Sequence, residues 1–332
     1  MMHPPARRPS ARVRAAGLTA GLLAAALLAA GCGLLSSSHA SQAGTRPRGT
    51  AASRSASGTP SPRAAPASPA SPASACPAVP RRFSCPMRAR IARVKRFLRT
   101  RPGITGVVLT DRATGAVWRN RYAATPVYMA STSKLAMAIT LLLQNRAGVI
   151  HLTSDDMATM HQMLHVSSDT AADDLWFKFG ASFYTGFFGR IGLTSPLYLH
   201  QPGVSGPYWG EMACPADELS RVVNYALDDL PATLRGYLVG ELRHVATDQH
   251  YGVWGAGPAS RPGNKDGWSV EKPGWIINSA GFAGPGARYT LVMMNSLRGQ
   301  GNYRDGTDTV TQIAAMLFRG HPVAAPTLRA TP

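Results

Sequence analysis

Apolar and polar positions alternate with two different periods along the chain. In residues 88–99, apolar side chains recur every three or four positions opposite a face of arginines, which predicts an amphipathic helix. Residues 104–110 and 116–122 are short runs rich in β-branched and aromatic residues, joined by a loop with turn chemistry. They predict a β-hairpin directly after the first helix.

The middle of the chain predicts helices, and its end predicts strands. A buried helix is expected from Ser131 to about residue 146, and further helices are expected in residues 153–176, 215–227 and 231–245. The end of the chain predicts strands in residues 267–270, 275–279 and 288–295, followed by a helix in residues 307–318. This order predicts an α+β fold, an α/β/α sandwich. One five-stranded antiparallel sheet would be built from both ends of the chain and flanked by helices, with an all-helical subdomain inserted between its strands.

The N-terminal third has a different composition. Residues 1–31 place arginines before a short apolar run that ends at Cys32, which is typical of an export signal. The sequence Leu-Ala-Ala-Gly-Cys at this point resembles a bacterial lipobox, so lipidation of Cys32 is expected, with an ordinary signal peptide as the alternative. Residues 32–85 are rich in Ser, Pro and Ala and predict a disordered tether. We expect one folded domain over residues 86–322 and a tail over 323–332.

The net charge of +18 is concentrated at this end of the chain. Residues 1–101 contain 17 of the 35 Lys and Arg and no Asp or Glu, so 18 basic residues face all 17 acidic residues in the remainder. Because the positive charge belongs to the signal, the tether and one helix, we expect attraction to an anionic membrane surface rather than nucleic-acid binding. The protein is therefore expected to be exported and held at the outer face of the cell membrane, as a monomer, by a lipid on Cys32 and this basic segment.

Cysteines and histidines suggest no cofactor. An exported protein can form disulfides, and Cys76 with Cys85 is the preferred pair, which leaves Cys214 as a buried structural thiol or, alternatively, a catalytic one. His161 and His165 stand four apart on a predicted helix, a spacing that can bind metal. No third ligand follows a recognisable motif, so neither a metal nor a cofactor is expected.

Ser131 and Lys134 are the first candidates for catalysis. Their spacing of three on a helix puts the hydroxyl and the amine on one face. A serine becomes a good nucleophile when a base removes its proton, and a desolvated lysine can be that base, whereas an arginine cannot. The chain has 30 Arg and only 5 Lys, so the use of a lysine at position 134 favours a proton-accepting role. The alternative is a surface lysine on an amphipathic helix.

Two further polar triplets follow in the chain. The first is Ser168-Asp169-Thr170, which by itself is also a normal helix N-cap. The second is Lys265-Asp266-Gly267, followed by Trp268 at the start of a predicted strand, and its composition is also that of a turn. Each triplet alone is a weak signal, and their order after Ser131 and Lys134 is the stronger one.

Together the three motifs resemble the Ser-x-x-Lys, Ser-Asp-Asn and Lys-Thr-Gly motifs of penicillin-recognising serine enzymes, specifically class A β-lactamases. The resemblance covers about residues 90–318. It implies Ser131 as the acylated nucleophile, Lys134 as its proton partner and Ser168 as the relay to the leaving nitrogen. It also implies that Lys265 attracts a substrate carboxylate, that Gly267 lets substrate lie close to the strand, and that the N–H groups of Ser131 and Trp268 form an oxyanion hole.

The sequence departs from that family at three places. Thr170 stands where the family has Asn, and Asp266 stands where it usually has Thr, and both positions would contact substrate. The glutamate that activates water in class A enzymes lacks its usual context. Glu211 is the candidate for that role, and the alternative is a carboxylate placed favourably near a helix N-terminus.

Three functions follow from this comparison. The first is an exported serine hydrolase that forms an acyl-enzyme on Ser131, most simply by opening a β-lactam. The second is a penicillin-binding D-alanyl peptidase or an esterase with slow deacylation, acting on a peptidoglycan-type peptide. The third is a catalytically silent binding module of the cell wall on the same fold.

Overall fold

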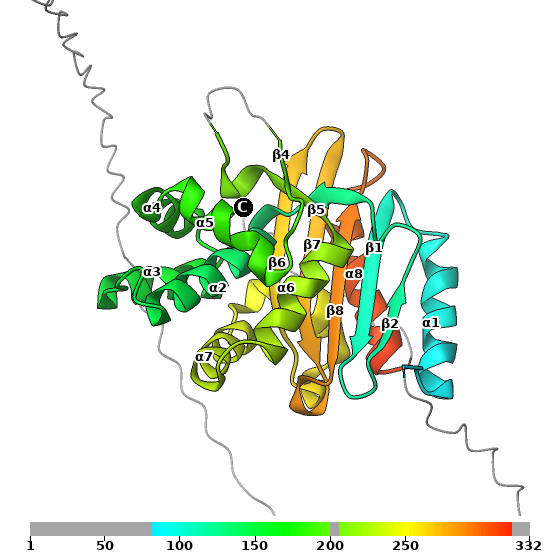
Figure 1. The fold of residues 1–332 in the computed structure, drawn as a ribbon. Coiled ribbons are helices and arrows are strands. Elements are labelled where there is room, and N and C mark those ends of the chain that lie inside the picture. Colours follow the sequence, from blue (N-terminus) through cyan, green and yellow to red (C-terminus); the bar gives the residue numbers. More distant parts are fainter. Residues whose placement is uncertain (1–80, 200–205, 321–332) are drawn as a thin grey trace, which may run out of the picture. The chain divides into compact units, whose positions relative to one another are not determined.

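The computed structural model describes residues 81–199 and 206–320, and its centre is one antiparallel sheet (Figure 1). The strands are β1 (Ile104–Asp111), β2 (Ala116–Arg119), β6 (Gly263–Glu271), β7 (Gly274–Ala283) and β8 (Tyr289–Ser296). Their order across the sheet is β2-β1-β8-β7-β6. Strands from the two ends of the chain therefore pair, with Val108 of β1 opposite Val292 of β8. The predicted five-stranded antiparallel sheet is confirmed.

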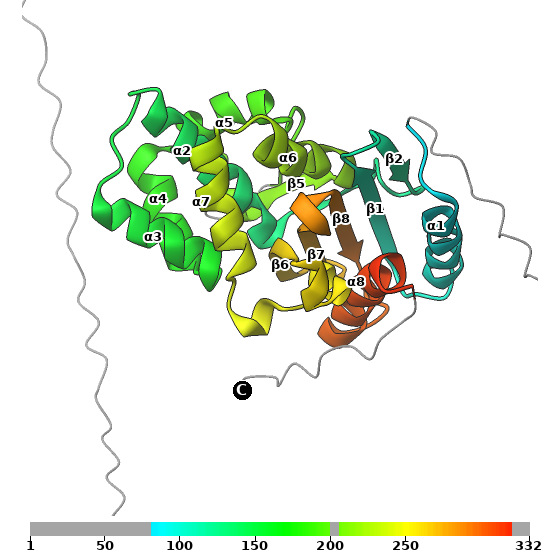
Figure 2. The same cartoon turned by 90° about the horizontal axis from the view of Figure 1, so that it is seen from below.

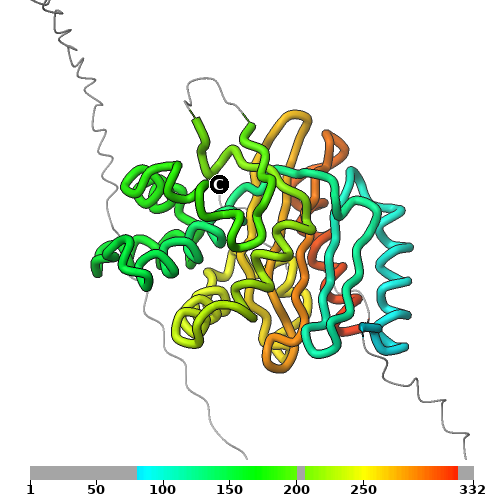
Figure 3. Tube along the Cα trace, in the orientation of Figure 1, coloured from blue at the N-terminus to red at the C-terminus, as the bar shows by residue number. Residues whose placement is uncertain are grey.

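Both faces of the sheet are covered, which confirms the α/β/α sandwich. Successive side chains in a strand point to opposite faces, so β1 sends Val108 into one apolar core and Val107 and Leu109 into the other. α1 (Cys85–Leu98) and α8 (Tyr303–Phe318) pack on the second core. They come from opposite ends of the described chain and lie side by side (Figures 2 and 3), with Arg90 donating a hydrogen bond to the carbonyl of Leu317.

A helical block covers the other face of the sheet. Its helices are α2 (Ser133–Arg146), α3 (Ser154–His165), α4 (Asp169–Phe179), α5 (Ala181–Phe188), α6 (Ala216–Asp228) and α7 (Ala232–Arg243). The α2 helix is buried from Ser133 to Leu142 because the other helices surround it. The inserted helical subdomain is therefore confirmed, and it brings α2 and α4 together beside β6.

The structure differs from the predicted elements at three points. The helix predicted from Ser131 begins instead with a 3-10 turn, η1 (Ala130–Thr132), before α2. The single helix predicted in residues 153–176 is two helices, α3 and α4, separated by residues 166–168. A small sheet in the order β3-β5-β4, formed by β3 (Pro126–Tyr128), β4 (Leu197–Tyr198) and β5 (Met212–Pro215), was not predicted because its strands are too short to show a period.

Several predictions concern the N-terminal segment. Cys32, Cys76, the signal segment and most of the tether lie outside the described residues. Cys85 begins α1 and is disulfide-bonded, and its pairing with Cys76 stays a prediction because Cys76 is not described. In the part of the chain that is described, no helix has the length and apolar character needed to cross a membrane.

Candidate functional site

Ser131 lies in the η1 turn between the sheet and the helical block. The residue before it, Ala130, has a left-handed backbone with φ of 45°, which costs free energy in a residue that carries a Cβ. The turn is held against β6, because a Cβ added to Gly267 would be 2.8 Å from the carbonyl oxygen of Met129 and 2.9 Å from the backbone nitrogen of Ser131. This close approach explains the glycine and fixes the Ser131 N–H beside the edge strand of the sheet.

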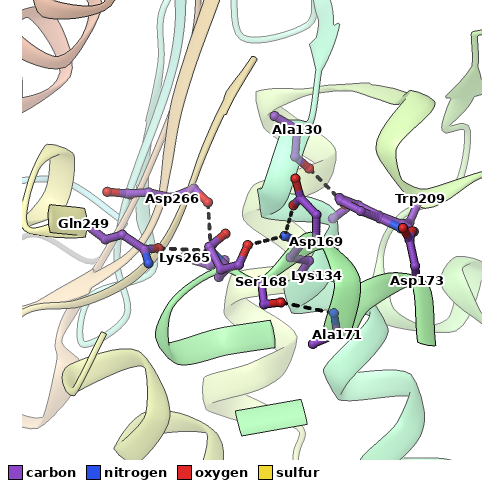
Figure 4. Close-up of polar contacts among 12 residues, drawn as sticks. Ala130, Lys134, Ser168, Asp169, Ala171, Asp173, Trp209, Gln249, Lys265 and Asp266 are labelled. Carbon is purple, nitrogen blue, oxygen red and sulfur yellow. Dashed lines mark hydrogen bonds and ion pairs between the residues drawn. The ribbon is translucent and has the colours of Figure 1, made fainter. Parts of the chain in front are cut away.

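Lys134 projects from the first turn of α2 and is fully buried. Its amine donates to Oδ1 of Asp169 at 2.5 Å and to the carbonyl of Ser167 at 2.6 Å (Figure 4). The amine also lies 4.6 Å from the ring centre of Trp209. Ser131 and Lys134 thus come from one helical segment, as predicted, and within the described residues the Ser131 hydroxyl makes no hydrogen bond.

Opposing effects set the pKa of Lys134. Burial lowers the pKa, because the charged amine has lost its water. The hydrogen bond to Asp169 and the charges of Asp169 and Asp173 raise it, and burial outweighs them. The net direction is the one that a proton-accepting lysine requires.

The residues that contact the two lysines lie one position earlier in the chain than the sequence predicts. The hydroxyl of Ser168 accepts from the backbone N–H of Ala171 and caps α4, as in the alternative for this residue. Ser167, with φ of 59°, is the serine whose hydroxyl accepts a hydrogen bond from Lys265. Asp169 binds Lys134, whereas Thr170 is exposed on α4. Ser167 and Asp169 therefore take the positions predicted for Ser168 and Thr170.

Lys265 reaches the same place from β6. It is fully buried, and its amine donates to the Ser167 hydroxyl at 2.8 Å, to Gln249 at 3.4 Å and to the carbonyl of Asp266 at 3.0 Å. Burial and then the neighbouring charge of Lys134 lower its pKa, while nearby carboxylates oppose the change. Lys134 and Lys265 thus both bind Ser167, Lys134 at its backbone carbonyl and Lys265 at its hydroxyl, which makes this residue the shared point of the site.

Asp266 does not lie where the sequence predicts. Alternation along β6 turns its side chain to the face opposite Lys265, where its carboxylate accepts from the amide of Asn264 at 2.5 Å and it pairs in register with Ser279. Burial raises the pKa of this carboxyl well above its ordinary value, against the hydrogen bond of Ser279 and the charge of Lys265. The Asp266 side chain is therefore buried on the face of the sheet opposite Lys265, and its contact with substrate stays a prediction.

The predicted role of Trp268 concerns its backbone N–H, and its side chain lies on the α8 side of the sheet. Its side chain packs among Tyr251 and Tyr303 in the core on the α8 side. Its backbone belongs to β6, which is an edge strand, so part of that strand's N–H groups have no strand partner. The indole is partly buried against that core, and only the backbone is available to the site.

Asp173 was not predicted as a site residue, and its carboxylate binds two aromatic side chains beside Lys134. Its Oδ1 accepts from the indole N–H of Trp209 at 2.8 Å (Figure 4). It also accepts from the hydroxyl of Tyr208 at 2.6 Å. These bonds hold η3 (Trp209–Glu211) against α4 and keep the Trp209 ring over the amine of Lys134. Sequence gives little signal for this role, because an aspartate inside a polar helix usually faces water.

Glu211 lies in η3 close to η1 and is buried. One of its carboxylate oxygens has no hydrogen-bond partner among the described residues. Burial raises the pKa of Glu211, and the charge of Glu271 raises it further. Asp169 and Asp173, rather than Glu211, are the carboxylates that act on Lys134.

The remaining candidates lie elsewhere. Cys214 is a free and fully buried thiol in β5, and burial raises its pKa, which is typical of a structural cysteine. His161 stacks on His165 and bonds to Glu241 at 2.8 Å. Within residues 81–199 and 206–320, no group of three His, Cys, Asp or Glu side chains could hold a metal ion.

Comparison with curated proteins gives one related group. The chain is 28% identical over 198 residues to "Putative lipoprotein LppW" of Mycobacterium tuberculosis H37Rv and to the protein of the same name from Mycobacterium bovis. The match covers 56% of this chain, and the chain spans 61% of the length of those relatives. No protein-family model matches the chain.

Comparison with solved structures identifies the fold. An ancestral class A β-lactamase superposes with a TM-score of 0.57 at 18% identity, covering 70% of this chain and 99% of that structure. PBP-A superposes with a TM-score of 0.59 at 15% identity, covering 73% and 98%, and the β-lactamase of Streptosporangium roseum with a TM-score of 0.57 at 16% identity, covering 70% and 98%. The chain therefore has the fold of the class A β-lactamases and of PBP-A.

Proposed function

We propose that this protein is an exported serine hydrolase that forms an acyl-enzyme on Ser131. Its substrate would be an amide or ester with a nearby carboxylate, of the β-lactam or D-alanyl peptide kind. One observation carries the proposal: two buried lysines and a serine hydroxyl converge beside a serine in a strained turn. Buried cations are costly, and perturbed titratable groups of this kind gather at functional sites.

Lys134 is suited to be the base. Burial favours its neutral amine, which can take the proton of Ser131 as the oxygen attacks a carbonyl carbon. Attack makes a tetrahedral oxyanion, and the N–H groups of Ser131 and Trp268 would stabilise it from the turn and the edge strand. The close approach at Gly267 keeps these two backbone segments in contact.

Ser167 and Lys265 are suited to the second half of acylation. When the carbon–nitrogen bond breaks, the leaving nitrogen needs a proton. The Ser167 hydroxyl can relay to it the proton that Lys134 took from Ser131. Lys265 donates to this hydroxyl, and its charge can attract the substrate carboxylate. The relay assigned from sequence to Ser168 thus passes to Ser167.

Hydrolysis of the acyl group needs a base that activates water. We assign this role to Glu211, because it is a buried carboxyl on the segment packed against η1. Its pKa is raised toward neutral pH, where a general base works best. Glu211 does not contact Lys134, so this base would act separately from the acylating pair. Glu211→Gln should then lengthen the lifetime of the acyl-enzyme, and an unchanged lifetime would remove the assignment.

A second candidate is a binding module without turnover. The observation that favours it is the ion pair of Lys134 with Asp169, at 2.5 Å, since a carboxylate keeps the lysine protonated and a protonated lysine is no base. The name of the related lipoproteins supports export, and with a lipid on Cys32 either activity would lie at the outer face of the membrane.

Labelling with a fluorescent penicillin separates the two functions. A hydrolase forms a covalent adduct that is seen in a gel and as a mass increase, and Ser131→Ala abolishes it. Lys134→Arg is the matched variant, because it keeps the positive charge but cannot give up a proton. Adduct formation in the wild-type protein and its loss in both variants support the hydrolase. No adduct with any β-lactam or activated ester would favour the binding module.

A further inference from the structure

A strongly basic pocket lies at the opposite edge of the sheet from the candidate active site. It has a volume of about 660 Å³ and lies between the C-terminal half of α1, the turn that follows, and the end of β2. Five of its eleven lining residues are cations, namely Lys95, Arg99, Arg101, Arg119 and Arg121, and none is acidic. β2 and β6 are the two outer strands of the sheet (Figure 1), so this pocket is separate from the site around Ser131.

Three of these cations are available to a ligand. Arg119 is paired with Asp217, and Arg101 donates to the hydroxyl of Thr309 and to a backbone carbonyl. Lys95, Arg99 and Arg121 are exposed, and none of them has an ion-pair partner in the described parts of the chain. The pocket therefore holds positive charge that the protein itself does not neutralise.

Local structure accounts for only part of this charge. Cations in the last turn of a helix offset the negative end of its dipole, which explains Lys95 and its neighbour Arg96. Arg121 comes from a different element, just after the end of β2, and no ion pair among the described residues offsets its charge. Like charges from two elements repel each other when they converge, so the convergence indicates an anionic ligand.

We propose that this pocket binds the phosphate of an anionic phospholipid headgroup. Arginine presents a planar fork of donors that matches phosphate geometry, and the volume lies in the range of small-molecule sites. Tyr122 lines the pocket and gives the pocket an apolar wall. The guanidinium of Arg121 lies 4.6 Å from the centre of the Tyr122 ring. The chain up to residue 101 has 17 basic residues and no acidic one, which is complementary to an anionic membrane.

Headgroup binding would also orient the folded unit at the membrane. A lipid on Cys32 alone would not set the orientation of the folded unit, because one anchor does not fix a direction. Headgroup binding at the β2 edge would turn that edge toward the membrane. The opposite edge, β6, would then face away from the membrane, toward substrates beyond it.

Binding is tested on the full chain in neutral detergent by calorimetric titration. The two probes are glycerophosphoglycerol, which is the soluble headgroup of phosphatidylglycerol, and inorganic phosphate. Lys95→Glu and Arg121→Glu reverse charge inside the pocket, from α1 and from the end of β2. Arg93→Glu is the matched control, because it makes the same charge change on an exposed position of α1 outside the pocket.

Saturable binding of the headgroup is expected, weakened at least about tenfold by each pocket variant and little by Arg93→Glu. The exposed positions allow all three variants to fold, and circular dichroism checks that they do. Equal losses in the pocket variants and the control would overturn the proposal, since they would show only the effect of net charge. Inorganic phosphate binding as tightly as the headgroup would overturn the assignment to lipid.

Discussion

Asp169→Asn should make the protein a faster acylating enzyme. Asp169 is the carboxylate that binds the amine of Lys134, and its charge raises the pKa of that lysine. Asparagine keeps an oxygen that can accept the same hydrogen bond but removes the charge. The neutral amine would then form at lower pH, and a larger fraction of the protein would hold the base in its active form.

The structure limits the size of this effect. The Lys134 side chain is fully buried, but that of Asp169 is 74% exposed, so water screens its charge. Ion pairs with an exposed partner are worth up to about 1 kcal/mol, which corresponds to about a fivefold change in the fraction of neutral lysine. We therefore expect the acylation rate below the pKa of Lys134 to rise about fivefold. The acidic limb of the pH–rate profile should move to lower pH.

Stopped-flow labelling with a chromogenic cephalosporin across a range of pH measures both the acylation rate and the position of the acidic limb. Asp174→Asn is the matched control, because it removes the same charge from an exposed position on the same helix. The rate of the control should equal that of the wild-type protein. A slower rate for Asp169→Asn, or a limb that does not move, would refute the role of Lys134 as the base.

Three further predictions follow from the described contacts. Ser168→Ala should lower the free energy of unfolding by about 1 kcal/mol through the lost cap and keep acylation, whereas Ser167→Ala should lose acylation about a hundredfold. Acylation kept in Ser167→Ala and lost in Ser168→Ala would instead favour Ser168 as the relay. Gly267→Ala should abolish labelling and cost about 1–3 kcal/mol in denaturant unfolding, because its Cβ meets backbone atoms of the turn at Ser131, and a variant that labels normally would contradict this. Asp266 has a raised pKa in the folded protein, so its contribution to stability is present at acidic pH and is lost as pH rises through that pKa; Asp266→Asn should flatten this fall in urea titrations, and parallel pH curves would argue against it.

Much of the fold was predictable because its strongest patterns are apolar. β1, β7 and β8 are buried on both faces, so their apolar runs stand out, and the turn between β6 and β7 has clear turn chemistry. The start of β6 was missed because residues 263–266 are polar. Lys265 and Asp266 are buried there only by partners from distant segments, which local sequence does not show.

The site was predictable in its components but not in its register. Ser131 and Lys134 were candidates because of their residue types and spacing, and Lys265 because of the resemblance in motifs. The structure brings Lys134 and Lys265 to the same serine, Ser167. The choice between Ser167 and Ser168 depends on which serine caps α4 and which has the left-handed backbone. Tertiary contacts make that choice, because neither serine favours positive φ on its own.

Peptide-mapped mass spectrometry of the acyl adduct tests the central claim most directly. After incubation with a β-lactam, we expect the added mass on the peptide that contains Ser131, in the wild-type protein and in Ser168→Ala. Ser131→Ala should carry no adduct under the same conditions. An adduct on another residue, or an equal adduct in Ser131→Ala, would contradict the claim that this serine is the nucleophile.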